Sequence, residues 1–84
     1  MHSIEFTREA IKVLGKMPRN VRELVMQKIE GLARDPFSAA NVKKLVGQPG
    51  YRLRVGDWRV VYDVDSERLV VRVLRIGARG GVYE

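Results

Sequence analysis

Four arginines and one tyrosine are the residues of this chain best suited to chemistry. They are Arg52, Arg54, Arg59, Arg79 and Tyr83. A guanidinium group donates two parallel hydrogen bonds to a phosphate and keeps its charge when partly withdrawn from water. An aromatic ring can stack on a nucleic-acid base. The set therefore points to a site that binds RNA and stabilises phosphate.

Such a set can cut RNA without help from a metal. The 2′-hydroxyl of RNA is the nucleophile, and the protein holds the reacting oxygens in line and stabilises the extra negative charge. The chain has no cysteine and a single histidine, His2, so we expect neither a Ser-His-Asp site nor a metal or cofactor site. An alternative stays open for each arginine, because outward basic residues commonly only keep a sheet soluble.

The size and charge of the chain indicate how many domains it forms and what kind of partner this site binds. Its 84 residues predict one domain, spanning 1–84, with a formal net charge of +6. Residues 43–84 hold nine basic and five acidic residues, and seven of the nine are arginine. This balance favours a nucleic-acid partner over a membrane. No apolar run is long enough to cross a membrane and the N-terminus does not resemble a signal peptide, so we expect a cytoplasmic protein.

The elements that position the arginines follow from periodicity. A short strand is expected at 3–6, and a helix with Thr7 as its N-cap runs to Met17. Pro18 suits the first position of a second helix, which Asp35-Pro36 ends. Segment 37–48 is expected to be a connection. Strands follow at 51–55, 58–64 and 69–76.

The predicted fold is α+β, in the order β-α-α-β-β-β. The N-terminal strand precedes an antiparallel helix hairpin, which packs on one face of an antiparallel β-meander. The helical stripes that should face the sheet are Ala10, Ile11, Val13, Leu14 and Met17 in the first helix and Val21, Leu24, Val25, Ile29 and Leu32 in the second.

The open face of this meander is the expected site. If Leu53 and Val55 face the helices, Arg52 and Arg54 project from the other face. Arg59 is within reach across the Gly56-Asp57 turn. Arg79 lies in a tail that can fold back over the sheet, with Tyr83 at the rim. Trp58 has the alternation of a core or a groove-wall residue, of which the core is favoured, and turn chemistry explains Asp63 and Asp65.

The stretches 51–64 and 70–77, YRLRVGDWRVVYDV and VVRVLRIG, resemble the RelE family of the RelE/ParE superfamily. The similarity spans almost the whole chain. It implies a RelE-like fold and the toxin of a type II toxin–antitoxin system. It also implies a ribosome-dependent endoribonuclease that cleaves mRNA in the ribosomal A site, with a cognate antitoxin as a partner.

The resemblance also implies roles for single residues. The paired basic residues of the first meander strand stabilise phosphate or accept a proton, and here they are Arg52 and Arg54. The phosphate clamp of the next strand is Arg59. The arginine after the terminal Ile-Gly assists the leaving group and is Arg79, and the tail residue that stacks on a substrate base is Tyr83.

Lys43, Lys44 and Arg75 are further residues expected to contact RNA or the ribosome. Two departures bear on proton transfer. Some relatives carry lysine where this chain has Arg52 and Arg54, and many carry histidine or a basic residue where it has Ala78.

Two other functions fit the same resemblance. A ParE-like toxin shares the architecture but inhibits DNA gyrase without nuclease activity, and a catalytically weak RNA binder fits the departures. Leu14 and Met17 are either part of an antitoxin-binding surface or ordinary core residues.

Overall fold

The computed structural model describes residues 1–78, so the predictions for Arg79 and Tyr83 fall outside the described residues. Seven elements form in this part of the chain. They are β1 (Ser3–Phe6), α1 (Arg8–Lys16), α2 (Arg19–Gly31), β2 (Val42–Lys44), β3 (Tyr51–Val55), β4 (Trp58–Asp65) and β5 (Val70–Ala78). The predicted α+β order is confirmed, with β2 added.

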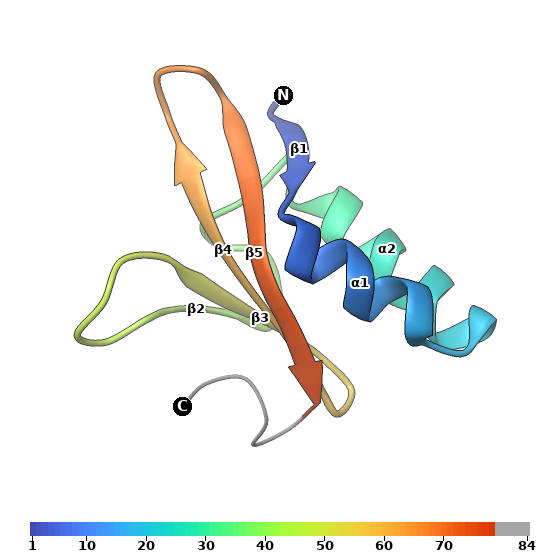
Figure 1. Ribbon diagram of the computed structural model, residues 1–84. Helices are drawn as coiled ribbons and strands as arrows, with labels where there is room; N and C mark the ends of the chain where they lie inside the picture. Colours follow the sequence, from blue (N-terminus) through green and yellow to red (C-terminus); the bar gives the residue numbers. More distant parts are fainter. Residues whose placement is uncertain (79–84) are drawn as a thin grey trace.

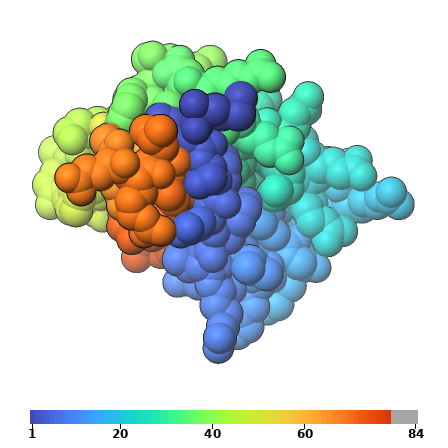
Figure 2. All heavy atoms as spheres, turned by 90° about the horizontal axis from the view of Figure 1, so that it is seen from above, coloured from blue at the N-terminus to red at the C-terminus, as the bar shows by residue number. Residues whose placement is uncertain are grey.

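The strands form one five-stranded sheet in the order β1-β5-β4-β3-β2. Strands β2 to β5 pair antiparallel, which confirms the meander, and β1 pairs parallel to β5 at the other edge. Figure 1 shows α1 and α2 side by side and antiparallel on one side of this sheet. Seen from above, the strands and the helices form two layers, with β1 between β5 and the helices (Figure 2). None of the helices in residues 1–78 combines the length and the apolar composition that crossing a membrane needs.

The core lies between the helices and one face of the sheet. Its fully or nearly buried members are Ala10, Leu14, Met17, Val25, Ile29, Leu32, Leu53, Val55, Val60, Tyr62, Val71, Val73 and Ile76. Because Leu53 and Val55 belong to it, the alternation in β3 turns the residues between and before them to the other face. Trp58 is partly buried and packs against this core, as predicted.

Thr7 joins the first strand, the first helix and β5. Its hydroxyl accepts a hydrogen bond from the backbone N–H of Ala10 (3.1 Å), which confirms the predicted N-cap. The same hydroxyl donates to the carbonyl of Leu74 (2.7 Å), and the Thr7 N–H donates to the carbonyl of Val73 (3.0 Å). These contacts fix the start of α1 against the middle of β5. A helix cap of this kind stabilises by about 1 kcal/mol.

The predicted bounds of the second helix are corrected at both ends. Pro18 is the N-cap and not the first helical residue, because its extended ψ of 148° lies outside helical geometry. The helix ends at Gly31, and the N–H groups of Leu32 and Ala33 then donate to carbonyls three residues back. Residues 32–34, which the sequence pattern assigns to the helix, form this tightened turn instead.

Two residues of the predicted stripes do not face the sheet. Ile11 is 58% exposed and Leu24 is 47% exposed, since the stripe that contacts the sheet is narrower than the apolar pattern. Leu14 and Met17 are 8% and 5% exposed and belong to the core. The idea that these two form an antitoxin-binding surface is therefore wrong for this structure.

The segment 37–48 is not only a connection, because it contains the edge strand β2. Val42, Lys43 and Lys44 pair with Leu53, Arg52 and Tyr51 of β3. Three residues are too few to show an alternation, and the pairing depends on a turn that the N–H of Leu45 closes by donating to the carbonyl of Gly50 (3.0 Å).

Tyr62 anchors the chain that leads into β2. Its ring is fully buried and its hydroxyl donates to the carbonyl of Pro36 (2.6 Å). The ring also stacks on Tyr51, with centroids 5.7 Å apart, and Tyr51 meets Phe37 edge-on at 5.5 Å. The path of this segment is thus fixed against the sheet at two points.

Candidate functional site

The two-residue turn between β3 and β4 sets the geometry of the site. Gly56 has a φ of 58°, the left-handed conformation that glycine adopts without strain. Val55 and Trp58 pair on either side of the turn, so Arg54 is the direct cross-strand partner of Arg59. Paired residues of antiparallel strands project to the same face, and their Cβ atoms are about 5 Å apart.

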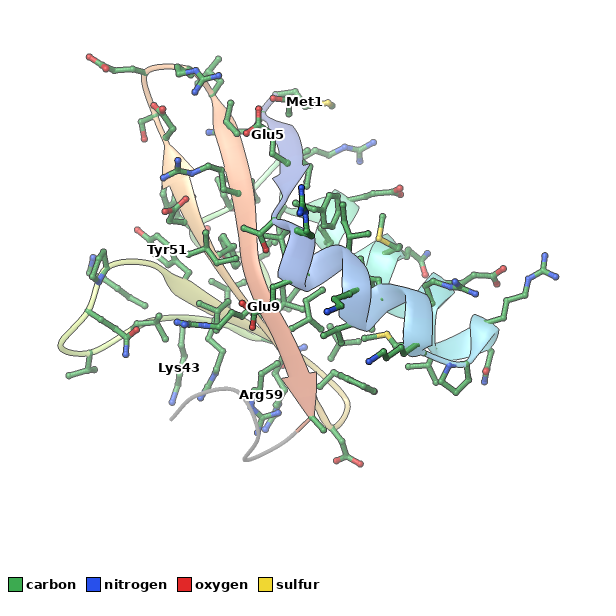
Figure 3. The ribbon with its side chains drawn as sticks, viewed as in Figure 1. Met1, Glu5, Glu9, Lys43, Tyr51 and Arg59 are labelled. Carbon is green, nitrogen blue, oxygen red and sulfur yellow. The ribbon has the colours of Figure 1, made fainter. Side chains whose placement is uncertain are left out.

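The register carries the same face across the sheet. Lys43 pairs with Arg52, Arg52 pairs with Val61, and Val61 pairs with Arg75. Five basic residues from four strands therefore project from the face that α1 and α2 leave uncovered. We call this set the basic band: Lys43, Arg52, Arg54, Arg59 and Arg75. Lys43 and Arg59 both extend to this side of the sheet in Figure 3.

A bulge in β5 brings Arg75 into the basic band. The pairing of β4 and β5 skips Leu74, because Val61 pairs with Arg75 and Tyr62 with Val73. The extra residue reverses the alternation in β5, and the carbonyl of Leu74 accepts the hydrogen bond from Thr7 described above. Without this bulge Arg75 would turn toward the helices.

Val61 forms an apolar floor under the basic band. It is 1% exposed although it does not belong to the helix-facing core. Its register partners are Arg52 on one side and Arg75 on the other, and long basic side chains cover apolar surface with their methylene stems. Placed over such a floor, the charged ends of the basic band face a ligand in a setting less screened than open water.

A groove of about 350 Å³ opens at the edge of the basic band. Asn41, Val42, Lys43, Arg52 and Arg54 line it. Asn41 has a left-handed φ of 68°, and its carbonyl accepts a hydrogen bond from the N–H of Arg54 (3.0 Å). This bond continues the pairing of β2 with β3 by one residue and places Asn41 at the rim. The groove thus offers three cationic groups and one amide to a ligand.

Arg59 is the most deeply placed cation of the basic band, at 9% exposed. Withdrawing a charge from water costs free energy, and an anion brought to the same place offsets that cost. Arg54, its direct partner, is exposed. The pair therefore combines a fixed cation at the base of the site with a second cation at the surface.

Some of the site residues predicted from the sequence share the open face of the sheet, and one does not. Arg52, Arg54, Arg59, Lys43 and Arg75 share the open face, while Lys44 projects to the opposite face, where its ammonium lies 5.5 Å from the centre of the Tyr51 ring. Their roles stay predictions, as do those of Arg79 and Tyr83. Within residues 1–78, no three His, Asp or Glu side chains gather closely enough to hold a metal ion.

The turn assignment is right for Asp65 and wrong for Asp63. Asp65 accepts hydrogen bonds from the N–H groups of Glu67 and Arg68, both at 3.1 Å. Asp63 lies inside β4 and pairs with Arg72 of β5, and the two side chains form a bidentate ion pair. The turn at 66–69 pairs Asp65 with Val70, and the unbroken register from there pairs Asp63 with Arg72 before the β5 bulge is reached.

Known proteins match this chain over nearly its full length. The sequence model of the family described as ParE toxin of type II toxin-antitoxin system, parDE, matches residues 4–83. The mRNA interferase toxin RelE of Escherichia coli (strain K12) is 34% identical over 79 residues, which cover 90% of this chain and 81% of that protein.

Solved structures agree with the sequence matches. An archaeal RelE–RelB complex from Pyrococcus horikoshii OT3 contains a chain with a TM-score of 0.83 and 26% identity, covering 96% of this chain and 98% of that one. The intact E. coli RelBE toxin–antitoxin complex contains one with a TM-score of 0.81 and 31% identity, covering 93% and 96%. The expected RelE-like fold is confirmed, and the chain belongs to the ParE toxin family of type II toxin–antitoxin systems, within the RelE/ParE superfamily.

Proposed function

We propose that this protein is the toxin of a type II toxin–antitoxin system and acts as an mRNA interferase that cleaves mRNA in the ribosomal A site. The observation that carries this proposal is the basic band, in which five cations from four strands meet on one face. The similarity to E. coli RelE, which is named an mRNA interferase, supports the same activity.

The basic band suits the chemistry of RNA cleavage by transesterification. The 2′-oxygen forms a bond to the adjacent phosphorus, the bond from phosphorus to the 5′-oxygen breaks, and a proton moves from the attacking to the leaving side. Negative charge builds on the phosphate oxygens in between, and guanidinium groups held in place stabilise it. Arginine stays protonated at neutral pH, so Arg52, Arg54 and Arg59 act by charge and orientation.

The deep position of Arg59 gives it the central role among the described residues. It is held by a β-strand in the middle of the sheet, with β3 and β5 on either side, and is therefore preorganised. We assign Arg59 to the phosphate at which the bond breaks, and Arg52 and Arg54 to the same or the next phosphate along the groove. Arg79 is proposed to assist the leaving group and Tyr83 to stack on a base.

We further propose an antitoxin as partner and the cytoplasm as location. The structures that this chain resembles include the archaeal RelE–RelB and E. coli RelBE complexes. An antitoxin that covers the basic band would keep it from RNA, and ribosomes that are translating mRNA are found in the cytoplasm.

The test is cleavage of mRNA in a purified translation system, with Arg59→Ala compared with Lys28→Ala. Lys28 is an exposed basic residue in the last turn of α2, so its removal makes the same charge change in the helix layer. We expect Arg59→Ala to lower the cleavage rate by about 10²–10³, as loss of one preorganised donor does, and Lys28→Ala to leave it near the wild-type rate.

Three results would contradict the proposal. Equal cleavage by both variants would place the site elsewhere. Binding to ribosomes without cleavage would fit the catalytically weak RNA binder. DNA breaks trapped on gyrase, with no RNA fragments, would fit the ParE-like alternative that the family description raises.

A further inference from the structure

The charged residues on the open face of the sheet have opposite signs on the two sides of the β5 bulge. On the side of the β3–β4 turn this face carries the basic band. On the other side, the open-face positions of β4 are Asp63 and Asp65, and Glu5 of β1 is paired with Arg72. Figure 3 shows Glu5 at the end of the sheet opposite Arg59. The face therefore changes from cationic to acidic along the strands.

Arg72 projects among these acidic residues, and Asp63 holds its side chain by two hydrogen bonds. Its Nε donates to Oδ1 of Asp63 and its Nη2 donates to Oδ2, both at 2.9 Å. The hydrogen bonds and charge of Asp63 raise the pKa of Arg72, and the charges of Asp65 and Glu5 add to the effect. The edge of the guanidinium formed by Nε and Nη2, which could grip a phosphate in fork geometry, is thus occupied by a carboxylate, and the rest of the group is held in the direction that Asp63 sets.

We propose that Asp63, by clamping Arg72 beside Asp65 and Glu5, forms an acidic boundary that ends the RNA track on this face. The proposal rests on the RNA-binding role of the basic band proposed above. A single strand of RNA then crosses the strands β2 to β5 over the basic band and does not continue along β4 and β5. Asp63 is a positioning residue in this scheme, because it acts on the RNA through Arg72.

The dimensions fit a short binding segment. Neighbouring strands are about 4.8 Å apart, so a band that spans four strands is about 14 Å wide. That width suits a few nucleotides of an extended single strand. A boundary on one side of so short a track fixes where the strand lies relative to Arg59, and with it which phosphate meets the site.

The test is equilibrium binding of a short single-stranded RNA, measured by fluorescence anisotropy against salt concentration. Asp63→Asn removes the clamp and frees Arg72 for phosphate. One added phosphate contact makes the salt slope steeper by about 0.7 and raises affinity about fivefold near 0.1 M salt. The double variant Asp63→Asn/Arg72→Gln has no freed cation, so its affinity should return toward wild type.

Matched controls separate a boundary from net charge. Glu30→Gln makes the same charge change on the exposed part of α2, in the helix layer, and should leave the salt slope unchanged. Glu5→Gln removes one acidic group beside Arg72 without breaking the Asp63–Arg72 ion pair. It should therefore raise RNA affinity by less than Asp63→Asn does. Thermal unfolding of each variant verifies its fold, and Glu5→Gln keeps the test decisive if Asp63→Asn does not fold.

Equal slopes for wild type, Asp63→Asn and Glu30→Gln would overturn the boundary. So would an unchanged RNA affinity combined with weaker antitoxin binding, since that would make the acidic end a protein contact. The binding assay needs no cleavage, so a wild-type protein that binds RNA but does not cut it would refute the proposed activity and leave the boundary to be judged on its own.

Discussion

Arg54 and Arg59 face each other as direct cross-strand partners on the open side of the sheet. Like charges in this relation destabilise a sheet by a few tenths to about 1 kcal/mol. A fold selected only for stability would place an opposite charge here, as it does at Asp63 and Arg72. Two guanidinium groups side by side suit the binding of an anion that both can contact.

This relation predicts a trade between stability and activity. Arg54→Gln should raise the free energy of unfolding by about 0.5 kcal/mol, because it removes the repulsion at an exposed position, and should lower RNA cleavage. Urea unfolding at low and high salt measures the first effect, and added salt should stabilise the wild type more than the variant. A variant that is less stable than wild type at low salt would show that the two guanidinium groups do not repel each other.

The buried hydroxyl of Tyr62 gives a second prediction. Tyr62→Phe removes the donor to the carbonyl of Pro36, and a buried acceptor that loses its partner costs about 1–3 kcal/mol. Tyr51→Phe removes the same atom from the partly exposed ring stacked on it and should cost less. Denaturant unfolding of both variants measures the difference, and equal losses would show that the Pro36 contact contributes little.

Tyr62 also predicts how stability changes with pH. Burial raises the pKa of Tyr62 far above its usual value near 10, and the charges of Tyr51 and Asp35 add to the rise. The unfolded chain therefore loses this proton near pH 10 while the folded protein keeps it. Stability due to this group is complete below pH 10 and falls above it, by at most about 1.4 kcal/mol per pH unit.

Thermal unfolding of wild type and Tyr62→Phe across this range isolates the effect, because other titrating groups are common to both proteins. The stability of the two should converge as the pH rises above 10. A constant difference would mean that the phenol ionises equally in the folded and unfolded chains.

The sequence was sufficient to predict much of the fold and the part of the site formed by Arg52, Arg54 and Arg59. The alternation around Leu53 and Val55 placed Arg52 and Arg54 on the open face, and the Gly56-Asp57 turn brought Arg59 beside them. These are local signals, with a period of two residues and a turn of two. Local rules decide them whatever the rest of the chain does.

The remaining features depend on contacts between distant segments. Strict alternation puts Arg72 and Arg75 on opposite faces, since they are three residues apart, and only the bulge at Leu74 puts both on the open face. Strand β2 is too short to show a pattern and forms because β3 pairs with it. Lys43 and Lys44 therefore look equivalent in the sequence, yet they lie on opposite faces of the sheet.

The turn that holds β2 in place gives a last prediction, which two glycines test as a pair. Gly47 and Gly50 both have left-handed φ values, 79° and 109°, so alanine at either position is strained. A Cβ on Gly47 would meet nothing within 4 Å, whereas one on Gly50 would lie 2.8 Å from the carbonyl oxygen of Tyr62. Gly47→Ala should cost about 1 kcal/mol in the free energy of unfolding, from backbone strain alone.

Gly50→Ala should cost more, because Gly50 directly precedes β3, so the start of β3 or β4 must also shift to relieve the contact, and that shift moves Arg52 relative to Lys43 in the groove. We therefore expect it to weaken RNA binding while Gly47→Ala does not. Denaturant unfolding and RNA titration of the two variants measure both effects. Equal losses of stability would mean that the approach of Gly50 to Tyr62 does not constrain the edge strand.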